Sequence, residues 1–178
     1  MQQLSFFGFL LPILLLPSIG LAQNPVDFEL RSATDSSHFT LSKVNGKFVA
    51  LHFLLKTDCP RCLRHTNNFI TRGKELPNVV QIFIKPDSDQ DIAAWAENLT
   101  DDEVDPYPIY RDPEAALAAQ FSIPDGYEFH GQIVHFPAFV LLDTHGVEVY
   151  RYVGKDNSDR FSFDQLLTKI SELRETSR

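Results

Sequence analysis

The chain has 178 residues and a net charge of −8, and 43% of its residues are hydrophobic. The negative charge disfavours nucleic acid and anionic membrane surfaces as partners, because both are themselves negatively charged. The hydrophobic content is sufficient for a folded core, and the length suits one domain after a short leader.

The leader is the first segment with a clear pattern. The first 22 residues carry no charged side chain, segment 4–16 is almost wholly apolar, and small residues follow where a signal peptidase cuts. The apolar stretch is shorter than the roughly 20 residues of a membrane helix, and Pro12 and Pro17 would interrupt it. We therefore expect a signal peptide over 1–22 and a single secreted or periplasmic domain over 23–178. The chain would be membrane-anchored only if the leader stayed uncleaved.

The first half of this domain alternates between strand and helix patterns. Residues 26–30 alternate in polarity and predict a short strand. Segments 48–55 and 79–84 are apolar runs, typical of strands buried on both faces of a parallel sheet. Segment 63–76 predicts a helix, and 89–99 predicts a second helix with its apolar side chains on one side.

The second half continues the same alternation. An Asp-Pro pair opens a predicted helix over 112–120, and a loop is expected over 124–131. A strand over 133–143, interrupted by a proline, turns through a His-Gly pair into a strand over 147–153. A last amphipathic helix is expected over 163–173. The fold class is therefore α/β, with a mixed central sheet flanked by helices, because the final hairpin must be antiparallel.

The sequence contains only two cysteines, Cys59 and Cys62, placed between the first apolar strand and the first helix. Closing so short a loop removes little entropy from the unfolded chain, so structural stapling explains the pair poorly. Redox chemistry or metal binding explains it better. A strand followed by Cys-x-x-Cys and a helix is the local arrangement of a thioredoxin-like redox site.

The surroundings of Cys59 favour its thiolate, which is the reactive form of the side chain. The N-terminus of the following helix supplies N–H groups and a partial positive charge. Lys56, Arg61 and Arg64 add positive charge, whereas Asp58 opposes them. We expect this balance to lower the pKa of Cys59.

Further segments extend the similarity beyond the cysteine motif. Phe28-Glu29-Leu30, Tyr107 to Asp112, Phe136 to Asp143 and Val153-Gly154 follow one another in the expected order. Over residues 26–173 the chain resembles the extracytoplasmic redoxin branch of the thioredoxin-like superfamily. That branch includes TlpA/ResA-like thiol–disulfide oxidoreductases and AhpC/TSA peroxiredoxins. The resemblance implies a thioredoxin-like fold.

The resemblance also implies roles for particular residues. Cys59 would be the nucleophile and Cys62 the resolving thiol, which attacks the mixed disulfide and releases the product. The Phe136–Pro137 bond would be cis and close to the cysteines. The backbone of Phe136 would then offer hydrogen bonds to an extended substrate chain.

Three positions depart from the relatives. Asp58 stands where thioredoxin-type sites usually have Trp, and Phe53 stands where thioredoxin has a buried acid. Peroxiredoxins place Thr three residues before the reactive cysteine, whereas this chain has Lys56 there. The peroxidase interpretation therefore lacks its motif.

Three histidines are candidates for the same site. His65 lies one helical turn after Cys62 and could tune a thiol, although a surface histidine is the favoured interpretation. His52 interrupts an apolar strand and is expected to be a hydrogen-bonded core residue. His135 lies two residues before Pro137, so it should share the face of Pro137 and is a candidate to line the site.

The leading hypothesis is an exported thiol–disulfide oxidoreductase without a cofactor. Its partners would be protein thiols and disulfides and a further redox protein that the sequence does not identify. One alternative is a peroxiredoxin-like thiol peroxidase. The other is a thioredoxin-fold protein that holds copper(I) or zinc through Cys59, Cys62 and one histidine, since thiolates suit soft metals.

Overall fold

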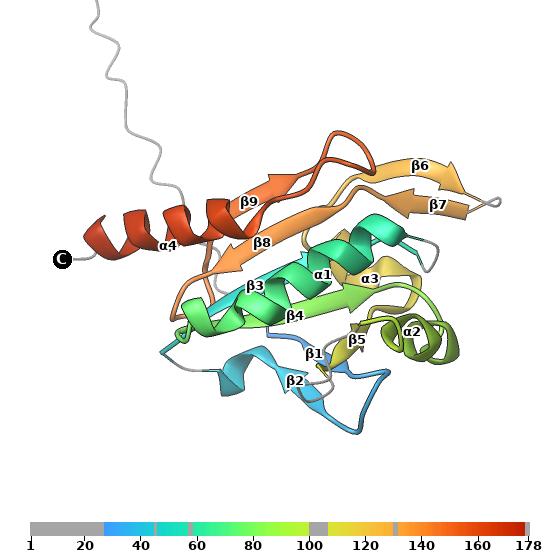
Figure 1. Cartoon of the computed structure of the whole chain (residues 1–178), viewed down its shortest axis with the longest axis horizontal. Helices are drawn as coiled ribbons and strands as arrows, with labels where there is room; N and C mark the ends of the chain where they lie inside the picture. The colour runs from blue at the N-terminus through green and yellow to red at the C-terminus, as the bar shows by residue number, and fades with distance from the viewer. Residues whose placement is uncertain (1–26, 45, 57–58, 100–106, 130–131, 177–178) are drawn as a thin grey trace, which may run out of the picture.

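The computed structural model describes residues 27–44, 46–56, 59–99, 107–129 and 132–176. The predicted signal peptide and Asp58 lie outside these ranges. The centre of the fold is a five-stranded sheet in the order β5-β4-β3-β8-β9 (Figure 1). Its strands are β3 (Phe48–Phe53), β4 (Val79–Lys85), β5 (Ile109–Arg111), β8 (Ala138–Leu142) and β9 (Glu148–Val153).

The pairing of these strands confirms the predicted mixed sheet. Strand β3 is parallel to β4 and antiparallel to β8, and β8 is antiparallel to β9. Five of the six residues of β3 are buried, as are six of the seven of β4, because the strands are covered on both faces. The continuous apolar runs that predicted these strands are the consequence of that double burial.

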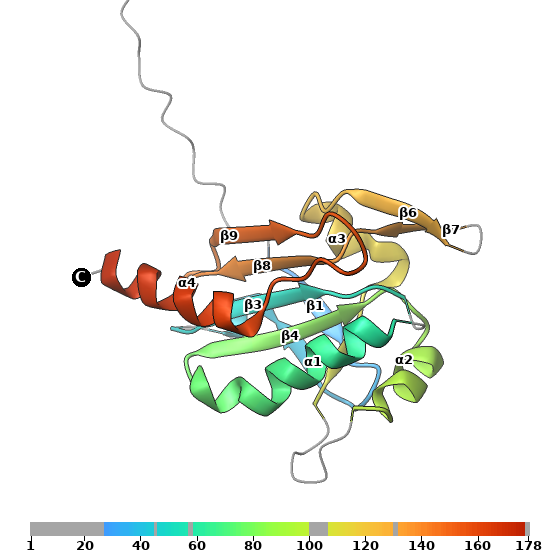
Figure 2. The ribbon, with the colours of Figure 1, turned by 45° about the horizontal axis from the view of Figure 1, so that its top comes forward.

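Helices α1 (Pro60–Arg72) and α4 (Phe163–Thr176) lie across one face of the sheet (Figure 1). Their buried side chains join those of α2 (Asp89–Ala96) in one hydrophobic cluster. The opposite face packs on β1 (Glu29–Arg31), β2 (His38–Thr40) and α3 (Ala116–Gln120), as the tilted view also shows (Figure 2). The architecture is thus a thioredoxin-like sheet with a layer on each face.

The predicted helix over 112–120 is broken rather than continuous. A 3-10 turn, η3 (Pro113–Ala115), precedes α3, and Glu114 and Ala115 have φ angles of 57° and 55°. Asp112 does cap α3, although the 3-10 turn lies between the two in the chain. Its carboxylate accepts hydrogen bonds from the N–H groups of Leu117 at 2.8 Å and Ala118 at 3.0 Å.

The expected loop over 124–131 was wrong, because β6 (Asp125–Phe129) and β7 (Gln132–His135) form an antiparallel hairpin there. It extends beyond the end of the central sheet (Figure 1). Gly126 allows the close approach of the two strands, since a Cβ atom there would lie 2.9 Å from the backbone N of Phe136. The strand expected over 133–143 is therefore divided at Pro137 between the hairpin and the central sheet.

The described residues also form two further 3-10 helices, η1 (Leu41–Lys43) and η2 (Gly73–Glu75). The second of these directly follows α1. None of the helices in the described ranges is long and apolar enough to span a membrane.

Candidate active site

Cys59 and Cys62 form a disulfide at the start of α1, with their Cα atoms 5.2 Å apart, which confirms the predicted pairing. Cys59 is the N-cap residue, and its Sγ accepts a hydrogen bond from the N–H of Cys62 at 3.1 Å. Pro60 takes the first helical position, where a missing N–H costs nothing. Cys59 is half-buried and Cys62 is fully buried, so only the first sulfur is open to a partner.

Arg160 is the site residue that sequence reasoning missed. It lies in the segment between β9 and α4, and its Nη2 donates to Sγ of Cys59 at 3.3 Å and to Sγ of Cys62 at 3.4 Å. The same nitrogen donates to the carbonyl of Asn157 at 3.2 Å. A guanidinium in this position stabilises negative charge on either sulfur once the disulfide opens.

The segment that carries Arg160 is held by local hydrogen bonds. The carboxylate of Asp156 accepts from the hydroxyl and the N–H of Ser158, both at 2.6 Å, and from the N–H of Asp159 at 3.1 Å. The carboxylate of Asp159 accepts from the hydroxyl of Tyr152 and from the N–H of Lys155. These bonds lower the pKa of both carboxyl groups and keep the turn before Arg160 in one conformation.

Gly154 joins this segment to Pro137. Its N–H donates to the carbonyl of Pro137 at 2.8 Å, and a Cβ atom at this position would lie 2.9 Å from Cγ of Pro137. It would also collide with the carbonyl of Asp159. A glycine is required because two backbone segments and a proline ring meet there.

Two histidines on neighbouring elements contact each other, His52 being buried and His65 half-buried. Nδ1 of His52, on β3, is 3.0 Å from Nε2 of His65, on α1, and Nε2 of His52 is 2.8 Å from Oε1 of Gln81 on β4. His52 stacks on Phe83 with ring centroids 4.6 Å apart. The predicted core role of His52 is confirmed. His65, for which a surface position was favoured, is half-buried, because the contact with His52 holds one side of its ring against the sheet.

Burial keeps this pair neutral. It lowers the pKa of His52 to about 4, against a smaller opposing effect of the hydrogen bond to Gln81. The pKa of His65 lies well below its ordinary value, first because of burial and then because of His52 and the positive charge of Arg160.

A small cavity brings several predicted and unpredicted residues together. His65, Pro137 and Arg160 line it, with Tyr152 and Phe161 closing it from the side of β9 and α4. Its volume is about 10 Å³, which is too small for an organic substrate.

The predicted cis bond before Pro137 was wrong, since the described residues contain no cis peptide. The physical reason lies in the strand boundaries. Pro137 sits between β7 and β8, so its ring removes no ladder hydrogen bond and no special geometry is needed. The N–H of Phe136 donates to the carbonyl of Pro124 at 3.1 Å, and its carbonyl accepts from Nδ1 of His135 at 2.7 Å. A role for Phe136 and Pro137 in substrate binding stays a prediction.

The remaining predicted tuning residues lie at different depths. Lys56 is half-buried, Arg61 is exposed on α1, and Asp58 lies outside the described residues. His135 is buried beside the ring of Phe53, and burial lowers its pKa.

Within the described ranges, no three His, Cys, Asp or Glu side chains gather as a metal site.

A buried lysine supports the chain just before the cysteines. Lys85 is fully buried, and its Nζ donates to the carbonyl of Leu55 at 2.6 Å. The ammonium group also pairs with Asp87 at 3.4 Å and lies 4.5 Å from the ring centre of Trp95. Lys85 thus fixes the end of β3, from which the segment towards Cys59 departs.

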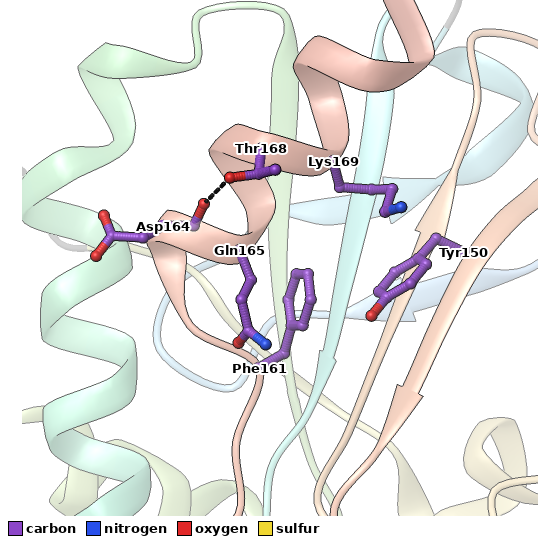
Figure 3. Close-up of a pocket in the computed structure, with 6 residues that line it drawn as sticks. All are labelled: Tyr150, Phe161, Asp164, Gln165, Thr168 and Lys169. Atoms are coloured by element: carbon purple, nitrogen blue, oxygen red, sulfur yellow. Dashed lines mark hydrogen bonds between the residues drawn. The ribbon is translucent and has the colours of Figure 1, made fainter.

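A second, more open cavity of about 330 Å³ lies between α4 and β9 (Figure 3). Phe161 and Tyr150 form its aromatic wall, with ring centroids 5.1 Å apart, and Nζ of Lys169 lies 4.9 Å from the ring centre of Tyr150. Thr168 is tied to its own helix by a hydrogen bond to the carbonyl of Asp164 (Figure 3). Phe161 lines both cavities, so one ring separates the outer cavity from the small one beside Arg160.

The sequence model of the Redoxin family matches residues 22–168, which is most of the chain. The chain belongs to the Redoxin family. By sequence, no curated protein matches this redoxin. Its family and its cysteine pair together assign it to the redox proteins that work through thiols.

Solved structures support the same fold. The redoxin is similar to AhpC of Enterococcus faecalis, with 18% identity, a TM-score of 0.72 and coverage of 88% of this chain and 93% of that one. It is similar to a 2-Cys peroxiredoxin of Plasmodium vivax, with 19% identity, a TM-score of 0.69 and coverage of 88% and 98%. It is also similar to the exposed lipoprotein thioredoxin of Streptococcus pneumoniae, with 23% identity, a TM-score of 0.63 and coverage of 83% and 99%.

Proposed function

We propose that this redoxin is an exported thiol–disulfide oxidoreductase that exchanges electrons with protein thiols. The observation that carries the proposal is the Cys59–Cys62 disulfide at a helix N-terminus with the guanidinium of Arg160 against both sulfurs. The helix N–H groups and the guanidinium both favour a thiolate, which is the species that attacks a disulfide.

In the reductive direction the thiolate of Cys59 attacks a substrate disulfide, and one substrate thiolate leaves. A mixed disulfide then links Cys59 to the second substrate sulfur. Cys62 attacks Sγ of Cys59, the substrate leaves as a second thiolate, and the Cys59–Cys62 disulfide forms again. Two electrons pass from the cysteine pair to the substrate. The same steps in reverse oxidise a protein dithiol.

The burial of the two sulfurs supports this division of roles. Cys59 is half-buried at the helix start, whereas Cys62 is fully buried. The partner's sulfur can reach only Cys59. The half-buried position of Cys59 suits a substrate cysteine that is accessible on the surface of another chain.

A peroxidase is the second candidate, favoured by the peroxiredoxin structures among the similar folds. In that reaction the Cys59 thiolate would attack a peroxide, release an alcohol or water, and become a sulfenic acid. Cys62 would then condense with it to the disulfide and release water. Against this candidate, Lys56 occupies the position of the peroxiredoxin threonine.

One comparison separates the two candidates. The reduced protein is mixed either with insulin, whose disulfides report protein reduction, or with hydrogen peroxide, with dithiothreitol as the electron source. We expect insulin reduction well above the dithiothreitol background and peroxide consumption no faster than with Cys59→Ser. Fast peroxide consumption with no insulin reduction would overturn the oxidoreductase proposal in favour of the peroxidase.

The proposal includes export, which the apolar segment before residue 23 supports. The similar protein of Streptococcus pneumoniae is, by its name, an exposed lipoprotein thioredoxin. Fractionation of cells that express the chain with and without residues 1–22 tests this part. Recovery of both forms in the cytosol would contradict export.

A further inference from the structure

The hydrogen bonds of the histidine pair assign its protons. The Gln81 amide is oriented with Oε1 towards His52, and because this oxygen can only accept, Nε2 of His52 carries a proton and donates at 2.8 Å. In a neutral imidazole the other nitrogen is then an acceptor, so Nδ1 of His52 receives the proton of His65 Nε2 at 3.0 Å. The basic nitrogen that remains in the pair is therefore Nδ1 of His65.

The position of His65 connects that nitrogen with the disulfide. Cys62 and His65 are three residues apart on α1, so their side chains are neighbours on one face of the helix. His65 lines the small cavity together with Arg160, and Arg160 contacts Sγ of Cys62 at 3.4 Å. Cys62 itself is fully buried, so bulk water does not reach its sulfur directly.

We propose that the His52–His65 pair accepts the proton of Cys62 when this thiol attacks the mixed disulfide on Cys59. The inference rests on the proposed function and names the group that the resolving step requires. The thiol of Cys62 gives its proton to Nδ1 of His65, and the resulting thiolate attacks Sγ of Cys59. The Cys59–Cys62 bond forms, the bond to the partner's sulfur breaks, and the departing thiolate takes up one proton from His65 or from water.

The charges around the pair suit a proton that is held only briefly. His65 faces His52 from β3 and Arg160 from the segment before α4, and Tyr152 of β9 closes the same cavity. In the oxidised state burial and Arg160 disfavour an imidazolium, so the pair starts neutral and can accept a proton. A thiolate offsets the charge of Arg160 and makes the imidazolium more stable. When the disulfide forms, this offset is lost and the proton leaves.

A chromophoric aromatic disulfide, dithiobis(nitrobenzoate), allows the two chemical steps to be followed in a single recording of absorbance against time. Attack by Cys59 on the probe releases the first nitrothiobenzoate ion, and attack by Cys62 on the mixed disulfide releases the second. We expect two phases from the reduced wild-type protein. His65→Gln should keep the first phase and slow the second by about tenfold to a hundredfold near pH 7, because general base catalysis typically contributes at least this much. The exposed His145→Gln is the matched control and should change neither phase.

The pH profile distinguishes proton transfer from a structural role. In His65→Gln the second phase should accelerate about tenfold per pH unit as Cys62 ionises without help, and it should approach the wild-type rate in alkali. An unchanged second phase, or equal slowing of both phases at every pH, would overturn the proposal. A wild-type protein that releases only one ion would instead refute the dithiol mechanism, so the two failures are distinguishable.

A measurement on the unaltered protein removes any dependence on variant folding. Titration of the His65 imidazole by heteronuclear NMR in the oxidised and reduced states should show a higher pKa in the reduced state. Equal pKa values in both states would contradict the proposed coupling between the pair and the cysteines.

Discussion

Nη2 of Arg160 lies 3.3 Å from Sγ of Cys59, although 101 positions separate the two residues in the chain. The contact joins the start of α1 to the segment that leads into α4. The guanidinium that contacts both sulfurs therefore comes from a part of the sequence far from the cysteine motif, whereas Lys56 and Arg61, which are near the motif in sequence, lie at half-buried and exposed positions.

Replacement of Arg160 by Gln should raise the pKa of the Cys59 thiol, since a nearby guanidinium favours its charged form. We expect alkylation of the reduced protein by iodoacetamide near pH 6 to slow by about tenfold, which corresponds to the loss of about 1.4 kcal/mol of charge stabilisation. Arg64→Gln, on the exposed side of α1, is the control and should change the rate much less. Equal slowing of alkylation in the two variants would indicate that the rate depends on the overall charge of the protein and not on the contact between Arg160 and the cysteines.

The two cysteines should differ in reactivity. Cys59 is half-buried and Cys62 is fully buried, so iodoacetamide should label Cys59 at least about tenfold faster, because reactivity follows thiolate character and exposure. Mass spectrometry of the reduced, briefly labelled protein measures the ratio. Cys62→Ser should in addition retain covalently bound partners, since no thiol remains to release them. Faster labelling of Cys62 would reverse the two roles.

The stability of the fold should decrease in mild acid. His52 has a pKa of about 4 in the folded chain and about 6.5 when unfolded, so between these values the unfolded chain binds the extra proton. The free energy of unfolding should therefore fall as pH falls from 6.5 to 4. Urea unfolding of His52→Gln should show a slope flatter by about 1 kcal/mol per pH unit near the middle of this window. His145→Gln should keep the wild-type slope, and an identical slope in both variants would contradict the assignment to His52.

Lys85→Met should destabilise the protein by about 1–3 kcal/mol, because the buried carbonyl of Leu55 loses its donor. Methionine retains most of the apolar volume beside Trp95, so the loss measures the polar contacts of the ammonium group more than packing. Chemical unfolding monitored by fluorescence gives the difference. Lys74→Met, at an exposed position after α1, is the control. If both variants unfolded alike, the bond to Leu55 would contribute nothing measurable.

Gly154→Ala should weaken the site without touching a cysteine. The added methyl group would collide with the carbonyl of Asp159 and the ring of Pro137, and Asp159 immediately precedes Arg160. We expect slower alkylation of Cys59 in the same direction as for Arg160→Gln, together with a lower melting temperature. Gly73, where a Cβ atom would meet nothing within 4 Å, offers the matched control Gly73→Ala. Unchanged alkylation in Gly154→Ala would show that the turn can shift without moving Arg160.

The elements next to the cysteines could be predicted from sequence because their signals are local. The apolar run of β3, the Cys-x-x-Cys spacing and the proline after Cys59 all lie within a short segment and determine a strand, a cap and a helix. The same holds for the hairpin between β8 and β9, where Gly146 has the positive φ of 78° that its turn requires.

The missed features depend on contacts between distant segments. No spacing in the sequence connects Arg160 with Cys59, and the burial of His65 depends on how α1 lies against β3. The β6–β7 hairpin was missed because segment 124–131 was expected to be a loop. In the fold Gly126 lets one strand of the hairpin approach the backbone of the other.

The separation of Arg160 from the cysteines also has a consequence for biosynthesis. A ribosome makes Cys59 and Cys62 about 100 residues before Arg160, at roughly 5–20 residues per second. During those seconds the thiols emerge without their guanidinium, and the segment before α4 must dock before the pair acquires its mature reactivity. We therefore expect the newly made chain to be a weaker nucleophile towards disulfides than the finished protein.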